Sequence, residues 1–131
     1  MLWGRGEGLE RFRNYRGFVG SKWDAHSVCR YSIVIENSVS QLYWSEKPAD
    51  ALLAFSFPLY YGTPQLSDYL PRGSYEPIDI ADPTVIDYIR RLMACGRAQA
   101  ARREIEAARW SLLHEQNLYA FLDRELAAIS A

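Results

Sequence analysis

YSIVIENSVSQLYWSEK, the stretch from Tyr31 to Lys47, decides the fold that the sequence predicts. Its β-branched centre, residues 33–35, is typical of a strand that is covered on both faces in a parallel sheet. Residues 37–38 form a turn that ends the strand, and Ser45 is a favourable N-cap for a following helix. A strand, a turn and a helix start in this order bring backbone N–H groups and a positive helix dipole to one place, where an anion can bind.

The segments that follow complete an α/β pattern. We expect the helix to run to about Ala54, a second strand over residues 57–62 and a helical turn over 65–69. Because strand, helix and strand follow one another, the two strands should be parallel. A last short strand is predicted over 76–80 and a further helix over 84–95. The fold class is therefore a Rossmann-like three-layer α/β domain with a short parallel sheet.

A long amphipathic C-terminal helix is predicted over residues 97–129. Its apolar residues form one stripe with alternating spacings of three and four: Ala98, Ala101, Ile105, Ala108, Leu112, Tyr119, Leu122, Leu126 and Ile129. Such a stripe usually docks on the chain's own core. Neighbouring apolar residues widen it, so a contact with a second copy or with another domain is the alternative. Residues 4–24 are expected to form a loop with at most one helical turn.

Composition narrows the class of protein. With 131 residues, 49% of them hydrophobic, the chain 1–131 is expected to be a single globular domain. A formal net charge of −1 provides no basic field for nucleic acid, and no apolar run approaches the length of a membrane span. No signal-peptide core is recognisable, so the expected location is cytoplasmic. Cys29 and Cys95 lack metal-binding spacing and are expected to be buried thiols.

Lys47 is the candidate ligand for a diphosphate. An ammonium group, free N–H groups and the helix dipole would act there together, each contributing on the order of 1 kcal/mol when exposed. A sugar nucleotide fits this site, because its diphosphate leaving group gains charge in the transition state. Glu46 would repel phosphate, and we expect it to bind the sugar and to stabilise an oxocarbenium-like ring. Asn37 and Ser38 follow the strand where ligands bind in open α/β sheets, and Tyr43 would cover the ribose or base.

The joint spacing of these residues resembles the donor-binding region of the α1,3-fucosyltransferases. ENS at residues 36–38 is followed by YWSEK at 43–47, FPLYYGTP at 57–64 and DYLP at 68–71. In that family the pattern is approximately F-E-N-[ST], Y-[VIF]-[TS]-E-K and P-[IV]-Y-[WY]-G-x-P, and the spacing matches without a gap. The resemblance covers about residues 4–80. Pro48 and Phe55 depart from it, because the family usually has a larger apolar residue and a glycine there.

The resemblance implies the C-terminal, GDP-fucose-binding half of a two-domain GT-B glycosyltransferase, which inverts the anomeric carbon and uses no metal. By this resemblance Lys47 would bind the diphosphate, Glu46 the fucose, and Asn37 and Tyr43 the nucleotide. Glu46 and Lys47 are the predicted catalytic residues. The predicted donor-binding set consists of Asn37, Ser38, Tyr43, Ser45, Glu46 and Lys47. No cofactor is implied other than GDP-fucose itself, which is the donor substrate.

The general base that such an enzyme needs is expected in an acceptor domain outside this chain, so the chain is predicted to be incomplete as a catalyst on its own. None of its own carboxylates is expected to replace that base. Two other functions stay open. One is a non-catalytic interaction module that forms oligomers through residues 97–129; the other is a transferase half that uses a different nucleotide sugar. The protein partners suggested by the sequence are an acceptor-domain chain and a second copy.

Overall fold

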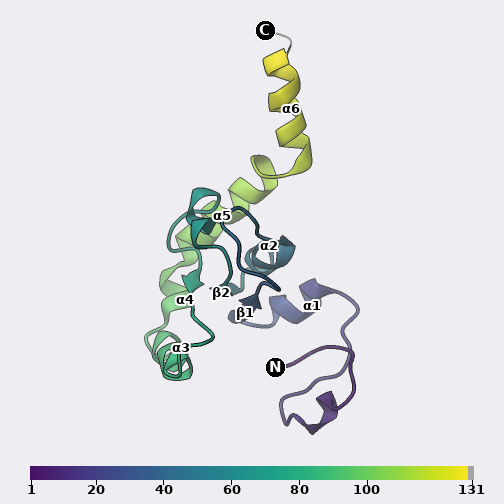
Figure 1. The fold of residues 1–131 in the computed structure, drawn as a ribbon, viewed down its shortest axis with the longest axis vertical. Helices are drawn as coiled ribbons and strands as arrows, with labels where there is room; N and C mark the ends of the chain where they lie inside the picture. The colour runs from purple at the N-terminus through teal and green to yellow at the C-terminus, as the bar shows by residue number, and fades with distance from the viewer. Residues whose placement is uncertain (130–131) are drawn as a thin grey trace.

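A computed structural model describes residues 1–129 of the chain and contains a three-stranded parallel sheet (Figure 1). The strands are β1 (Tyr31–Ile35), β2 (Phe57–Tyr61) and β3 (Glu76–Pro77), in the spatial order β1-β2-β3. β1 and β2 pair over their whole lengths, with Tyr31 opposite Phe57. β3 is shorter than predicted. Directly after it, the Ile78 N–H donates a hydrogen bond to the Tyr60 carbonyl of β2 at 2.8 Å. The predicted α/β fold with a short parallel sheet is confirmed.

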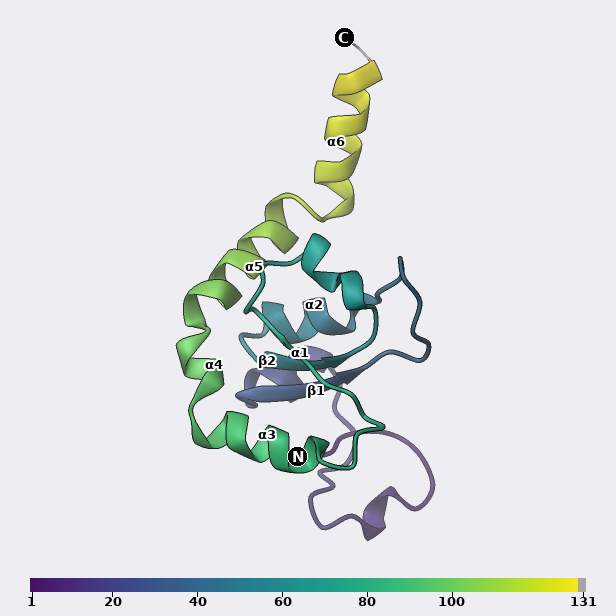
Figure 2. The ribbon, with the colours of Figure 1, turned by 60° about the vertical axis from the view of Figure 1, so that its left-hand side comes forward.

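Helix α2 (Glu46–Leu53) lies between the first two strands in sequence and covers one face of the sheet. Ser45 caps it, because its Oγ accepts a hydrogen bond from the Lys47 N–H at 3.3 Å. Pro48 lies in the first turn, where a proline is tolerated, and is buried with Ala51 and Leu52. Figure 2 shows α2 on one face of the sheet and α3 (Val85–Ala94) on the opposite face, which gives three layers.

Tyr31 fixes the second helical layer to the sheet. Its hydroxyl donates to the carbonyl of Leu92 in α3 at 3.2 Å and accepts from the N–H of Ala98 at 3.0 Å. Ala98 belongs to α4 (Arg97–Ala100), and the Arg97 guanidinium lies 5.0 Å from the centre of the Phe57 ring. Aromatic residues at the amino end of the sheet therefore hold α3 and α4 in place.

The segment predicted as one helix is divided into three: α4, α5 (Arg102–His114) and α6 (Leu118–Ile129). Ala101 has a ψ of 12° between α4 and α5, and α5 ends where the Glu115 and Gln116 N–H groups both bind the Ser111 carbonyl. The predicted apolar stripe docks only in its first part, where Ala98, Ile105 and Ala108 are buried. In contrast, α6 has no buried residue and projects from the body of the domain (Figure 1).

The first 30 residues contain more helix than the sequence predicted. A 3₁₀ turn, η1, spans Leu9–Arg11, and helix α1 spans Lys22–Ser27, where Ser21 Oγ accepts from the Trp23 N–H at 3.2 Å. A second 3₁₀ turn, η2 (Pro64–Asp68), confirms the helical turn predicted after β2.

The prediction of buried cysteines was wrong, because Cys29 is half-buried and Cys95 is exposed. Within residues 1–129 there is no helix that is both long enough and apolar enough to cross a membrane.

Candidate functional site

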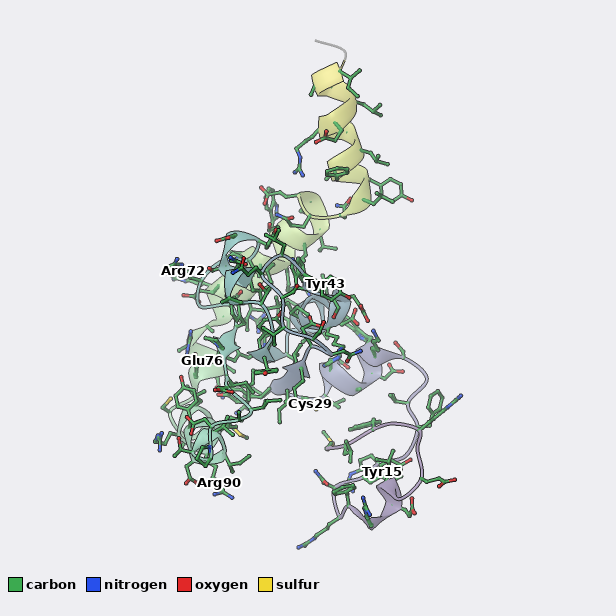
Figure 3. All side chains as sticks on the ribbon, viewed as in Figure 1. Tyr15, Cys29, Tyr43, Arg72, Glu76 and Arg90 are labelled. Carbon is green, nitrogen blue, oxygen red and sulfur yellow. The ribbon has the colours of Figure 1, made fainter. Side chains whose placement is uncertain are left out.

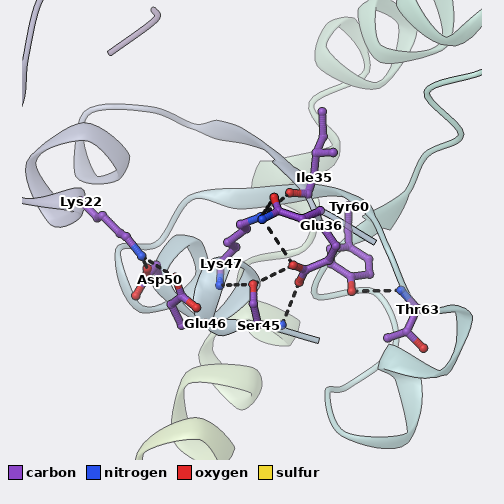
Figure 4. A network of polar contacts seen from close by, with 10 residues as sticks. Lys22, Ile35, Glu36, Ser45, Glu46, Lys47, Asp50, Tyr60 and Thr63 are labelled. Atoms are coloured by element: carbon purple, nitrogen blue, oxygen red, sulfur yellow. Dashed lines mark hydrogen bonds and ion pairs between the residues drawn. The ribbon is translucent and has the colours of Figure 1, made fainter. Parts of the chain in front are cut away.

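The Lys47 side chain ties the start of α2 to the end of β1 (Figure 4). Its Nζ donates to the Ile35 carbonyl at 2.8 Å and to Asn37 Oδ1 at 3.0 Å, and lies 3.7 Å from Glu36 Oε2. Ile35 is the last residue of β1, and Asn37 begins the turn after it. The ammonium group therefore lies at the carboxyl end of the sheet and beside the N-terminus of α2, as the sequence predicted.

Glu36 is the buried centre of this site. Only 1% of its side chain is exposed. Its carboxylate accepts two hydrogen bonds from Ser45, from the backbone N at 2.9 Å and from Oγ at 2.7 Å. Burial of a carboxylate is costly unless hydrogen bonds and an opposite charge compensate it, and here Ser45 and Lys47 do so. Glu36 thus positions the helix cap and the lysine together.

Gly62 allows the residues behind Glu36 to approach closely. A Cβ at this position would lie 2.2 Å from Tyr60 Oη and 2.7 Å from Glu36 Cγ, both well below van der Waals contact. The Tyr60 hydroxyl accepts from the Thr63 N–H at 3.1 Å, and burial raises the pKa of Tyr60 to about 12. Thr63 Oγ1 in turn donates to the Gln41 carbonyl at 2.9 Å. The loop between β1 and α2 is therefore attached to the turn after β2.

Glu46 faces the opposite side of the helix start from Glu36 and is bound by Lys22 of α1. The Lys22 ammonium lies 2.7 Å from Glu46 Oε1 and 2.9 Å from Asp50 Oδ2. The hydrogen bond that Lys22 donates lowers the pKa of Glu46, and the bonds that Lys22 donates to Glu46 and Asp50 raise the pKa of Lys22. The Lys22 and Glu46 side chains are well exposed, so solvent weakens this pair, and the single charge of Lys22 balances only one of the two carboxylates near the helix N-terminus.

The structure brings three of the six predicted site residues, Asn37, Ser45 and Lys47, into one hydrogen-bonded network around Glu36. Glu46 lies on the other side of the α2 N-terminus, in a separate ion pair with Lys22. Ser38 and Tyr43 are exposed on the loop between β1 and α2, and Tyr43 is marked in Figure 3. A ligand over the helix start would have to recruit them. The roles predicted for all six residues in donor binding stay predictions.

Sequence reasoning missed Glu36 and Lys22 as parts of the site. Glu36 carries a recognisable signal, since a carboxylate directly after an apolar strand is rarely buried without a specific partner. The contact of Lys22 with Glu46 has no local signal in the sequence, because the two residues are 24 positions apart and only the tertiary fold brings them together.

No protein-family model matches the chain, and neither the curated proteins nor the solved structures contain a significant match. The resemblance to the α1,3-fucosyltransferases therefore stays a prediction that rests on the sequence motifs alone.

Proposed function

We propose that this chain is the donor-binding domain of a fucosyltransferase-like enzyme and binds GDP-fucose for inverting, metal-independent glycosyl transfer. The observation that carries the proposal is the position of Lys47. Its ammonium lies at the carboxyl end of β1, beside the capped N-terminus of α2. Ligands of open α/β sheets bind at this edge, and helix N-termini attract phosphate.

The contacts of Lys47 suggest how a diphosphate would enter. Asn37 Oδ1 and the Ile35 carbonyl are neutral acceptors, so a phosphate oxygen could replace one of them without leaving a charge unpaired. Glu36 stays bound to Ser45 and keeps the helix start in place. As the bond between fucose and diphosphate breaks, negative charge grows on the phosphate beside Lys47, which stabilises the transition state.

Glu46 would bind the sugar. Its carboxylate points away from Glu36, and the hydrogen bond from Lys22 lowers its pKa, which favours the ionised form. An ionised carboxylate accepts hydrogen bonds from sugar hydroxyls and stabilises positive charge on the ring. We expect the general base for the acceptor hydroxyl to come from an acceptor-binding domain, and we expect the complex to act in the cytoplasm.

A titration of the purified chain with GDP-fucose and GDP tests this function. We expect calorimetry to detect both ligands, Lys47→Ala to weaken them about tenfold or more, and raised salt to weaken them further. Arg90→Ala is the matched control, because it removes the same charge from exposed α3, far from Tyr43 (Figure 3). The proposal fails if neither ligand binds at high protein concentration. Tighter binding of GDP-mannose or a UDP-sugar would instead support the alternative of another nucleotide sugar.

A second candidate function, self-association through α6, is favoured by a different observation. Tyr119 and Ile129 of α6 are 83% and 82% exposed, and Leu118 and Phe121 are also exposed. A helix of 12 residues none of which is buried gains little stability from packing and is marginally stable in water, so a partner surface would stabilise it.

Light scattering after size-exclusion chromatography tests this second candidate. We expect the chain to be a dimer and Leu122→Asp to make it monomeric. Ala127→Asp should leave the dimer intact, because Ala127 lies on the opposite side of the helix by the 3.6-residue period. A monomeric wild-type chain would exclude self-association.

A further inference from the structure

A separate pocket lies at the amino ends of β1 and β2, and it has a volume of about 370 Å³. Its walls come from the segment between α1 and β1, the segment between α2 and β2, α4 and α5. Arg30 directly precedes β1 and Phe55 lies just before β2, whereas Asn37 follows β1. Because the strands are parallel, this pocket and Lys47 are at opposite edges of the sheet. Figure 3 likewise shows Cys29 and Tyr43 well apart on the domain.

The charged side chains that line this pocket are Arg30 and Arg102, and among the described lining residues there is no carboxylate. When the Gln99 amide is oriented with its oxygen towards Arg30, this oxygen accepts from Arg30 Nε at 3.2 Å and from Nη1 at 2.6 Å. Gln99 thus holds the Arg30 guanidinium at the wall. Arg102 Nε donates to Glu106 Oε1 at 2.7 Å, but both side chains are more than half exposed, so this pair offsets little of the positive charge.

Phe55 forms the rim of the pocket in a strained conformation. Its φ is 59°, in the left-handed region that bulky residues rarely adopt. The guanidinium of Arg109 lies 3.8 Å from the centre of its ring, and that of Arg102 lies 4.8 Å away. Burial, with the charge of Arg102 as a second cause, lowers the pKa of Arg109. The ring therefore holds two like charges near each other, and an anion beside them would stabilise this arrangement.

We propose that this pocket binds a compact oxyanion, a phosphate or carboxylate group, through Arg30 and Arg102. The planar fork of a guanidinium group matches the oxygens of both kinds of anion and forms charge-assisted hydrogen bonds with them. Strained residues of the Phe55 kind cluster at ligand sites, where the surrounding structure maintains them. The pocket does not depend on the donor site, and either site can bind without the other.

Cys29 gives a local measure of occupancy, because its thiol is half-buried and lines the pocket. In a Cys95→Ser background, the rate of Cys29 alkylation by N-ethylmaleimide is measured against inorganic phosphate or malonate, with ionic strength held constant by chloride. We expect each effective anion to slow alkylation with a saturable dependence. The anion that protects Cys29 at the lower concentration shows whether the pocket prefers phosphate or carboxylate.

Variants separate this pocket from other anion effects. Arg102→Gln should weaken the protection about tenfold or more, since one charge-assisted contact is lost. Arg30→Gln should weaken the protection to a similar extent, and it replaces Arg102→Gln in the test if that variant does not fold. Arg103→Gln is the matched control on the same helix, because Arg103 is exposed and does not line the pocket. Lys47→Ala should leave the protection unchanged.

Three results would overturn the proposal: no protection by either anion, protection without saturation, or equal protection in the Arg102→Gln and Arg103→Gln variants. Loss of protection in Lys47→Ala would also overturn it, since the anion would then act through the donor site. Failure of GDP-fucose binding has no bearing on this result, so the two proposals fail separately.

Discussion

The buried carboxylate of Glu36 accepts both a backbone and a side-chain hydrogen bond from Ser45, with lengths of 2.9 and 2.7 Å. This pair joins the end of β1 to the N-cap of α2 and closes the loop between them. Lys47, two residues further along, lies 3.7 Å from the same carboxylate. The buried carboxylate of Glu36 therefore determines where α2 begins and where the Lys47 ammonium group lies.

Replacement of Glu36 by glutamine should destabilise the fold. The amide keeps the size of the side chain but places an NH₂ group where one carboxylate oxygen accepts from Ser45, and it removes the charge beside Lys47. We expect a loss of about 1–3 kcal/mol in the free energy of unfolding, the usual cost of an unsatisfied buried polar group. Urea unfolding at pH 7 measures it, with Glu7→Gln at an exposed carboxylate as the control. Equal stabilities of the two variants would contradict the prediction.

A methyl group at position 62 should disturb the same centre from the other side. The added Cβ would lie 2.2 Å from Tyr60 Oη, so Tyr60 or Glu36 must move. Overpacking of this kind costs typically about 1–3 kcal/mol. Gly20→Ala is a suitable control, because nothing lies within 4 Å of a Cβ there and its φ is not in the positive range. Thermal unfolding of both variants measures the difference, and a Gly62→Ala protein as stable as Gly20→Ala would refute the close approach.

The parts of the fold that the sequence predicted well are those specified by neighbours along the chain. The β-branched run at Ile33 predicts a strand, and the N-cap at Ser45 predicts the start of α2, without reference to the rest of the protein. The prediction of one continuous helix over 97–129 was wrong. It rested on the apolar spacing, which is nearly regular across the breaks between α4, α5 and α6. The break at Ala101 is a local change of ψ to 12°, and α5 ends where the Glu115 and Gln116 N–H groups share the Ser111 carbonyl. The apolar periodicity records neither feature.

In the candidate site, too, the contacts between residues close in sequence were predictable and the long-range contacts were not. Lys47, Asn37 and Ser45 lie within 11 residues of sequence, and their proximity follows from the strand, turn and helix. The contact of Lys22 with Glu46 and the approach of Tyr60 to Gly62 and Glu36 depend on how α1 and β2 pack. Local patterns could therefore predict where the candidate site lies but not which side chains complete it.

The backbone strain at Phe55 can be separated from the packing of its ring. Both Phe55→Ala and Phe55→Gly remove the contacts with Arg102 and Arg109, but only glycine adopts a φ of 59° without steric cost. We therefore expect Phe55→Gly to be about 1 kcal/mol more stable than Phe55→Ala. Denaturant unfolding of the two variants under the same conditions gives this difference directly. If the alanine variant is the more stable, Phe55 does not lie in the left-handed region.

His26 should make the stability of the domain depend on pH in the neutral range. Its Nδ1 lies 2.7 Å from Ser32 Oγ, which in turn lies 2.7 Å from Ser56 Oγ. Burial lowers the pKa of His26 below its ordinary value of 6.5, while Asp50 raises it and Lys22 lowers it further. As the pH falls through 6.5, the unfolded chain binds a proton before the folded chain does. The contribution of His26 is therefore full above this pH and decreases below it.

The measurement is the free energy of unfolding at pH values from about 7.5 to 5.5, a range chosen around the ordinary histidine pKa. Glu46 and Asp82, whose pKa values are lowered by hydrogen bonds from Lys22 and from the Thr84 backbone, affect stability only below their ordinary values of 4.5 and 3.8. They leave this window undisturbed. Wild type should lose stability towards pH 5.5, and His26→Gln should lose less, whereas exposed His114→Gln should follow wild type. Parallel curves for wild type and His26→Gln would mean that the imidazole is not buried against Ser32.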